Sequence, residues 1–137
     1  MAVEQVIGSS VANADCVFCQ LKQQDRFVAE YGQVFAVLDK FPVTKGHHLV
    51  ISKRHVGNWF SLSFEERRDV ESLLSELKRQ IQQDDPTVTG FNIGTNCGAS
   101  AGQTVMHAHV PRNRRRDDDV PDPRGGVRGC IPGKMGY

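Results

Sequence analysis

The stretch Gly102-Gln103-Thr104-Val105-Met106-His107-Ala108-His109-Val110 places two of the chain's five histidines at alternate positions, directly after a polar turn. Alternate residues of a β-strand point to the same face, so His107 and His109 are predicted to share one surface while their neighbours pack behind them. Imidazole can act near neutral pH as a nucleophile, a general acid or base, or a metal ligand. Alternatively, both rings are half-buried strand side chains bonded to the backbone. The surrounding sequence decides between these interpretations.

Length and charge limit the class of protein. The chain has 137 residues, the size of one domain, and its 17 basic and 16 acidic residues give a net charge of +1. This balance offers no broad electrostatic case for binding nucleic acid or membranes. Residues 1–14 lack the basic and apolar regions of a signal peptide, and no apolar run reaches membrane-spanning length. We therefore expect a cytoplasmic protein with a flexible arm over residues 1–14 and a single domain over residues 15–137.

Hydrophobic patterning predicts an α+β fold. Ser63 and Glu66 have the spacing of a capping box, and apolar residues recur at helical spacing from Val70 to Ile81, which predicts one long helix ending before Pro86. Residues 16–23 are predicted to form a short N-terminal helix. Runs rich in β-branched and aromatic residues predict five strands, mainly antiparallel, over residues 27–30, 33–38, 47–52, 90–95 and 104–110.

The C-terminal residues change character from about residue 112. A basic run is followed by an acidic run, and residues 120–137 are rich in glycine and proline. We expect an irregular tail there, either disordered or folded as a turn over a pocket or a second subunit.

Four cysteines are present, and two of them are closely spaced as Cys16-Val17-Phe18-Cys19. Without a secretory signal, this spacing indicates a metal site or redox chemistry rather than a disulfide framework. Cys97 and Cys130 have no metal-like spacing and are predicted to be free thiols.

Taken together, these residues resemble the histidine-triad (HIT) hydrolases and transferases. That family carries a Gly-Gln-(Thr/Ser)-Val-x-His-x-His-x-His signature, which residues 102–109 match through the second histidine. The resemblance implies a HIT-like α+β fold and a homodimer with a sheet continuous across two subunits. Further landmarks follow in the family's order at residues 16–19, 35–39, 42–47, 49–51, 53–55 and 91–94, and residues 122–128 resemble the tail of bacterial members related to diadenosine-polyphosphate hydrolases.

One position departs from the signature. Pro111 stands where the family has its third histidine. Proline fixes φ and lacks an amide proton, so strand pairing is predicted to stop near Val110, or the edge is remodelled there. A loop would then bring Arg112 or Arg114 to the vacated place. The related galactose-1-phosphate uridylyltransferases use His-x-His without a third histidine, so its loss does not by itself exclude nucleotidyl transfer.

The resemblance implies a two-step displacement. Neutral His109 would attack the α-phosphate of a nucleoside phosphoester, phosphoanhydride or phosphoramidate, giving a nucleotidyl-histidine that water or another acceptor resolves. Its other ring nitrogen must donate a proton to a backbone carbonyl or a neighbour, which leaves the attacking lone pair free. A purine nucleotide or dinucleoside polyphosphate is the implied partner. The implied catalytic group comprises His109, His107, His47, Gln103 and Thr104, and the implied nucleotide contacts are Asp39 to ribose, Phe18 to the base, and Asn96 and Gln103 to phosphate.

The resemblance also implies a zinc site. Zinc-bearing relatives use a cysteine pair, the histidine after Lys-Arg and the first histidine of the signature. Two thiolates and two imidazoles suit tetrahedral Zn²⁺, which would be structural and would hold His107 beside the nucleophile. In the alternative, the cysteines are reduced and His107 bonds to His47. The corresponding ligands here are Cys16, Cys19, His55 and His107.

Two hypotheses without catalysis remain open. In the first, the chain is a nucleotide-binding module that has lost turnover together with the third histidine. In the second, it is a zinc-stabilised nucleic-acid binder that uses the arginines of residues 112–116. The adjacent acidic residues 117–119 largely neutralise that basic run, which disfavours the second hypothesis.

Overall fold

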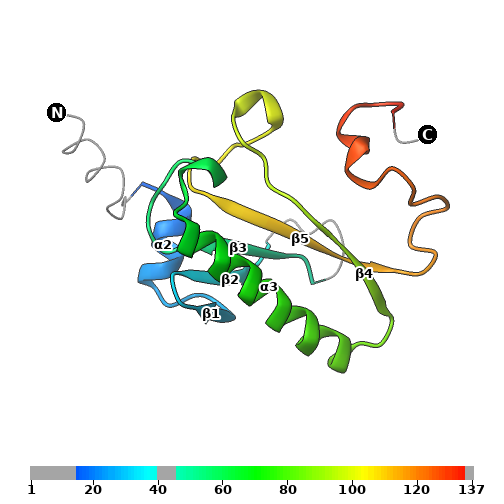
Figure 1. The fold of residues 1–137 in the computed structure, drawn as a ribbon, viewed down its shortest axis with the longest axis horizontal. Helices are drawn as coiled ribbons and strands as arrows, with labels where there is room; N and C mark the ends of the chain where they lie inside the picture. Colours follow the sequence, from blue (N-terminus) through cyan, green and yellow to red (C-terminus); the bar gives the residue numbers. More distant parts are fainter. Residues whose placement is uncertain (1–14, 40–45, 135–137) are drawn as a thin grey trace.

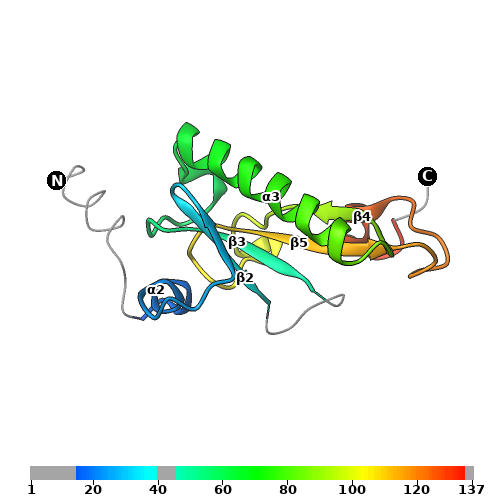
Figure 2. The same cartoon turned by 90° about the horizontal axis from the view of Figure 1, so that it is seen from below.

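The computed structural model describes residues 15–39 and 46–134 of the chain, and the arm expected over residues 1–14 lies outside them. The five strands form one antiparallel sheet in the order β1-β2-β3-β5-β4. Figures 1 and 2 show the long helix α3 across one face of this sheet and the short helix α2 against the other. The predicted α+β class is therefore confirmed. None of the helices in the described part is long and apolar enough to cross a bilayer.

Four strands lie close to their predicted positions: β1 (Ala29–Tyr31), β2 (Val34–Leu38), β3 (His48–Ser52) and β4 (Val88–Ile93). The turn between β1 and β2 depends on Gly32, which has φ +52° and lies against α3. A Cβ atom there would lie 2.4 Å from Oδ2 of Asp69, so a larger residue would displace this carboxylate, and the positive φ disfavours any side chain at this position. The same carboxylate accepts a hydrogen bond from the Gln33 backbone N–H at 3.0 Å.

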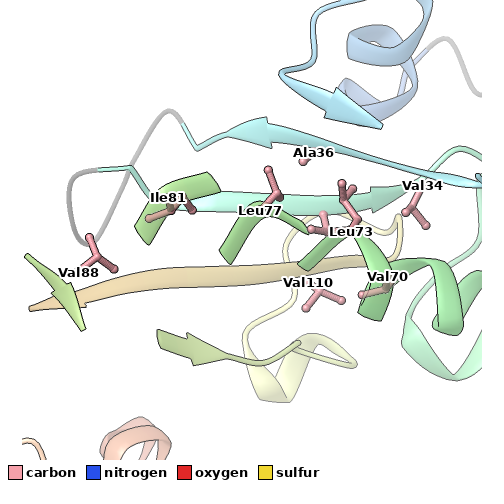
Figure 3. Close-up of a cluster of buried hydrophobic side chains, with 9 residues drawn as sticks. Val34, Ala36, Val70, Leu73, Leu77, Ile81, Val88 and Val110 are labelled. Atoms are coloured by element: carbon pink, nitrogen blue, oxygen red, sulfur yellow. The ribbon is translucent and has the colours of Figure 1, made fainter. Parts of the chain in front are cut away.

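Helix α3 (Phe64–Asp84) begins with the predicted capping box. Ser63 Oγ accepts from the Glu66 N–H at 3.1 Å, and Glu66 Oε1 accepts from the Ser63 N–H at 2.8 Å. Leu73 is only 1% exposed, and truncating a side chain buried to this extent costs about 2–5 kcal/mol. The helix residues Val70, Leu73, Leu77 and Ile81 pack on Val34, Ala36, Val50, Val88 and Val110 of the sheet (Figure 3).

Helix α2 (Val17–Gln23) covers the opposite face of the sheet. Seven residues are too few for a helix that is stable by itself, so burial of its apolar side chains must hold it in place. Phe18 and Cys19 supply that burial, packing with Phe35, Val37, Leu49 and Ile51 in a second core cluster. The second face therefore carries the N-terminal cysteine pair.

The fifth strand corrects two predictions. β5 spans His109–Arg116, so it begins later than residue 104 and continues through Pro111, and the irregular tail begins after Arg116 rather than at about residue 112. Proline is tolerated because of the register. In an antiparallel ladder, hydrogen-bonded residue pairs alternate with pairs that are not hydrogen-bonded. The Ser52 N–H donates to Ala108 O, so the pair Ser52–Ala108 is a bonded one. Three positions along the ladder, Pro111 lies opposite Leu49 at a pair that exchanges no backbone hydrogen bonds.

The missing amide proton of Pro111 consequently faces the other neighbour, beyond the end of β4. There the Gly94 N–H still donates to Pro111 O at 3.3 Å, and only the reverse bond is lost. The prediction that pairing stops at Val110 was wrong because the cost of a strand proline depends on which edge its nitrogen faces.

Arg112 does not replace the third histidine. It is 1% exposed, donates to Leu74 O and His48 Nδ1, both at 3.1 Å, and lies over the Phe91 ring, on the α3 side of the sheet. Arg114 follows two residues later and shares that face. Neither arginine lines the pocket described below.

Candidate functional site

His107 and His109 share one surface, as predicted, and it faces α2, although β5 begins only at His109. The ring of Phe18 from α2 packs edge-on against both, with centroid distances of 5.9 Å to His107 and 4.9 Å to His109. His107 is fully buried, whereas His109 is partly exposed. Of their neighbours, Ala108 and Val110 are buried, but Met106 is 51% exposed and does not pack behind the pair.

The tautomer of His109 follows from one hydrogen bond. Its Nδ1 atom lies 2.8 Å from the carbonyl oxygen of His107. A carbonyl oxygen only accepts, so Nδ1 must be the donor. In the neutral ring, Nε2 therefore carries the lone pair. The required arrangement of a nucleophilic imidazole, with one nitrogen held and the other available, is present.

His109 lines a pocket of about 480 Å³ between α2, β2, β3 and the start of β5. Apolar side chains form most of its wall. The polar residues among its described lining are Arg26, Asp39, Thr104 and His109. Arg26 was not identified from the sequence, because an exposed arginine in the loop before β1 belongs to no motif. The remaining lining is Val17, Phe18, Leu21, Val37, Leu38, Leu49, Val105 and Pro111.

Asp39 lies at the edge of this pocket and is joined to His47. Its Oδ2 is 3.6 Å from His47 Nδ1, and its backbone N–H donates to His47 O at 2.9 Å. Burial lowers the pKa of His47, although the Asp39 carboxylate acts in the opposite direction. His47 is buried and is not among the described lining residues, and Asp39 links it to the pocket.

The residues before the histidines occupy different places. Thr104 lines the pocket, whereas Gln103 and Asn96 do not. Gln103 is buried: its Oε1 accepts from the Gly98 N–H at 2.9 Å, and its Nε2 donates to Gly57 O at 2.6 Å and Val105 O at 3.0 Å. Both amide hydrogens are therefore used within the chain. Gln103 therefore braces the turn that leads to His107, and the expected phosphate contacts of Gln103 and Asn96 stay predictions.

Four side chains converge beside the pocket. Ligand atoms of Cys16, Cys19, His55 and His107 all lie within 4.8 Å of one another. His107 Nδ1 lies 3.4 Å from Cys16 Sγ, 3.5 Å from Cys19 Sγ and 3.2 Å from His55 Nδ1, and Cys19 Sγ lies 3.3 Å from His55 Nδ1. Cys97 and Cys130 are free thiols outside this cluster, as predicted.

Four of the six separations among these atoms have the lengths of edges in a tetrahedral metal site. With Zn–N bonds of about 2.0 Å and Zn–S bonds of about 2.3 Å, tetrahedral geometry gives N···N edges of about 3.3 Å and N···S edges of about 3.5 Å. The observed edges agree within a few tenths of an ångström. The four residues are thus positioned to bind a metal ion.

The second nitrogen of His107 fixes its orientation toward this cluster. Nε2 donates to the Ser52 carbonyl oxygen at 2.6 Å, so Nδ1 is the unprotonated nitrogen that faces the thiols. Burial lowers the pKa of His107 to about 4, which keeps the ring neutral. The alternative pairing of His107 with His47 is therefore not the arrangement found.

His55 is positioned by a buried ion pair. The preceding residue, Arg54, donates to both carboxylate oxygens of Glu66, at 2.7 and 3.3 Å, and Glu66 is fully buried. Ser52 Oγ donates to Arg54 O at 2.7 Å and tightens the same turn. The sequence identified Glu66 only as a capping residue. Its position one turn before Val70, on the apolar face of α3, was the signal of a buried partner.

The sequence and the fold match known proteins. The HIT domain family matches residues 20–111. A HIT-like protein of Mycoplasma pneumoniae is 39% identical over 104 residues, covering 74% of this chain and 72% of the relative. An adenosine 5'-monophosphoramidase of Schizosaccharomyces pombe is 33% identical over 97 residues, covering 69% of each chain. The crystal structure of a Zn-bound histidine triad family protein from Mycobacterium smegmatis aligns with a TM-score of 0.70 at 30% identity, covering 79% of this chain and 84% of that one.

The protein thus has a five-stranded sheet with one long helix. Its pocket contains one histidine with a fixed tautomer and lies next to a Cys₂His₂ cluster. By its fold and by these matches, the chain belongs to the HIT (histidine triad) family.

Proposed function

We propose that this protein is a nucleotide hydrolase or nucleotidyltransferase that acts at the α-phosphate of nucleoside phosphoanhydrides, phosphoesters or phosphoramidates. The observation that carries the proposal is the bond from His109 Nδ1 to His107 O, which leaves Nε2 as the nucleophilic nitrogen of a residue that lines a pocket. The adenosine 5'-monophosphoramidase of S. pombe supports a substrate with an adenylyl group.

In the first step, the Nε2 lone pair of His109 attacks phosphorus. The bond from phosphorus to the leaving group breaks, and its electron pair departs with that group. Nδ1–H remains bound to His107 O, so the positive charge that develops on the ring lies against a carbonyl dipole. In the second step, water or another acceptor attacks phosphorus and releases its proton to solvent, the P–N bond breaks, and its electron pair returns to Nε2.

The pocket supports recognition of a nucleoside. We assign the Asp39 carboxylate to the ribose hydroxyls, Phe18 and Leu38 to the faces of a purine base, and Thr104 to the phosphate. The tail, similar to that of relatives of diadenosine-polyphosphate hydrolases, makes dinucleoside polyphosphates a second substrate class to test. His47 then acts as a positioning residue through Asp39.

We propose that the metal is zinc and that it is structural. Two thiols and two imidazoles form a donor set that zinc prefers, and four protein ligands leave no open coordination position. When bound, the ion supplies a fixed anchor for α2, the His55 turn and His107. The Zn-bound relative from M. smegmatis supports this identity.

We also propose a homodimer whose sheet continues across β4. This strand pairs with β5 on one side only, which leaves its other edge as a template for a further strand. A groove of about 590 Å³ lies between α3 and β4, and Phe64 and Ile93 on its wall are 78% and 51% exposed. An exposed apolar surface of this kind is typical of an interface.

The alternative is a nucleotide-binding module with weak or no turnover, and Pro111 is the residue that favours it. Single-turnover mixing of protein with a diadenosine polyphosphate distinguishes the two. We expect nucleotide release by the wild-type protein and none by His109→Ala, which should still bind AMP with nearly unchanged affinity. Binding without release by the wild-type protein would establish the module, and release by His109→Ala would reject this nucleophile.

A further inference from the structure

Pro111 lies in the wall of the same pocket as His109, and its neighbours there offer no obvious proton for a leaving group. A threonine hydroxyl donates hydrogen bonds but keeps its proton near neutral pH, and an arginine guanidinium stays protonated. The His109 N–H is already bound to His107 O, and Asp39 faces His47. Among the described residues that line this pocket, no imidazole other than His109 is present.

The chemistry of the leaving group makes this composition important. When a P–O bond to a phosphate or carboxylate breaks, the oxygen departs with the electron pair as a stable anion, and no proton is needed. When a P–N bond to an amine breaks, the nitrogen must gain a proton to leave as a neutral amine. A general acid in the site accelerates such a step by about 10²–10⁴-fold.

The only cationic side chain among the described lining residues points the same way. Arg26 brings a positive charge to the pocket, and Asp39, the acidic residue among the described lining, is assigned above to the ribose. Such a charge attracts an anionic group and gives no benefit to a neutral amine. The lack of a proton donor in the pocket wall and the charge of Arg26 therefore both favour substrates with an anionic leaving group.

Building on the proposed function, we infer that this chain selects substrates whose leaving group departs as an anion, namely nucleoside phosphoanhydrides or mixed anhydrides with carboxylic acids, and that it is a poor phosphoramidase. It would differ in this from the S. pombe relative, whose name describes cleavage of a phosphoramidate. The first step then moves no proton: the P–Nε2 bond forms, the P–O bond breaks, and the anion leaves.

The test compares two substrates with the same adenylyl group, diadenosine tetraphosphate and adenosine 5'-phosphoramidate, in single-turnover assays of the zinc-loaded protein. Three chains are assayed: wild type, Pro111→His, which offers a proton donor, and Pro111→Ala, which removes the ring without offering one. We expect the wild-type protein to cleave the anhydride at least about a hundredfold faster. Pro111→His should reduce that ratio at least tenfold, and Pro111→Ala should leave it within about threefold.

Similar rates of the wild-type protein on both substrates would overturn the inference, as would an equal gain from Pro111→Ala. If Pro111→His loses its zinc or its fold, the inference is tested with the wild-type protein alone, by measuring its cleavage rate on a series of AMP aryl esters. Its rate should fall several-fold for each unit of rise in the pKa of the phenol, and a flat series would contradict the inference. Failure of the proposed function is distinct, because no substrate in either set would then be cleaved.

Discussion

His109 is held through Nδ1 by the carbonyl oxygen of His107, at 2.8 Å, and the His107 side chain is itself one of the four groups positioned to bind a metal ion. The backbone of His107 thus sets the tautomer of the proposed nucleophile, while its ring lies beside the cysteine pair. We infer that the metal site and the nucleophile are mechanically coupled. Loosening the cluster should disturb the orientation of His109 without removing any group from the pocket.

We expect Cys19→Ser to reduce both metal content and turnover. Cys19 is 2% exposed, and its Sγ lies near both His55 and His107, so its loss removes a ligand at the centre of the cluster. Metal analysis should find one zinc ion per wild-type chain and less than half of that in the variant, with turnover reduced at least tenfold. Cys97→Ser is the matched control and should keep both. Purified protein without zinc, when prepared without chelators, would refute the zinc assignment.

Glu66→Gln should destabilise the protein and speed its loss of zinc. The substitution removes the charge that holds Arg54 and, through it, the turn carrying His55. Hydrogen bonds to charged groups contribute about 1.5–3 kcal/mol, so we expect a loss of about 2 kcal/mol in the free energy of unfolding, measured in urea. Glu76→Gln breaks only the exposed pair with Arg79 and should not change the midpoint. Equal midpoints for both variants would remove Glu66 from this role.

Acid should weaken the fold partly through His48. Burial, followed by the nearby Arg112 charge, lowers the pKa of His48 from 6.5 to about 4. Between these values the unfolded chain binds more protons than the folded one, so stability is lost as the pH falls from 6.5 toward 4. The slope for this group is at most about 1.4 kcal/mol per pH unit.

The matched variant is His48→Gln, which keeps an acceptor for Arg112 but does not titrate. Urea denaturation at several pH values should give a shallower decline for this variant than for wild type. Identical slopes would show that His48 does not contribute. His47 and His107 have lowered pKa values too, so only the difference between the two chains is diagnostic.

The dimer proposal predicts that Ile93→Asp yields a monomer. This residue ends β4 and lies on the wall of the groove beside α3, so a carboxylate there would be desolvated on association. Sedimentation equilibrium should report a dimer for wild type at micromolar concentration. Val28→Asp is the control, because Val28 is similarly exposed but lies beside β1, at the opposite edge of the sheet. A wild-type monomer, or an Ile93→Asp dimer, would contradict the proposal.

Features of the fold that depend only on residues close together in the sequence could be predicted. Helix α3 follows from its capping box and its apolar spacing. Strand alternation predicted the shared face of the two histidines, although only His109 lies in β5 and His107 precedes it. Features that depend on distant partners could not be predicted. The effect of Pro111 depends on the register with β3 and β4, and Arg112 is buried because Leu74 O and His48 meet it from elsewhere in the chain.

The same limit applies within the site. The cysteine spacing and the resemblance to the HIT family identified all four residues of the metal cluster. The hydrogen bonds of Gln103 to backbone groups of the neighbouring loops, in contrast, were not predicted. The order of residues in a motif did not reveal which polar groups the surrounding backbone would occupy.

The most direct test of the account is to trap the covalent intermediate. Zinc-loaded protein is mixed with excess diadenosine tetraphosphate, quenched in base within the first turnover, digested and analysed by mass spectrometry. We predict an increase of one adenylyl group on the peptide that contains His109, lost on treatment with acid and absent from His109→Ala. Nucleotide release without any adduct, or an adduct on a different residue, would contradict the central claim that His109 Nε2 attacks phosphorus.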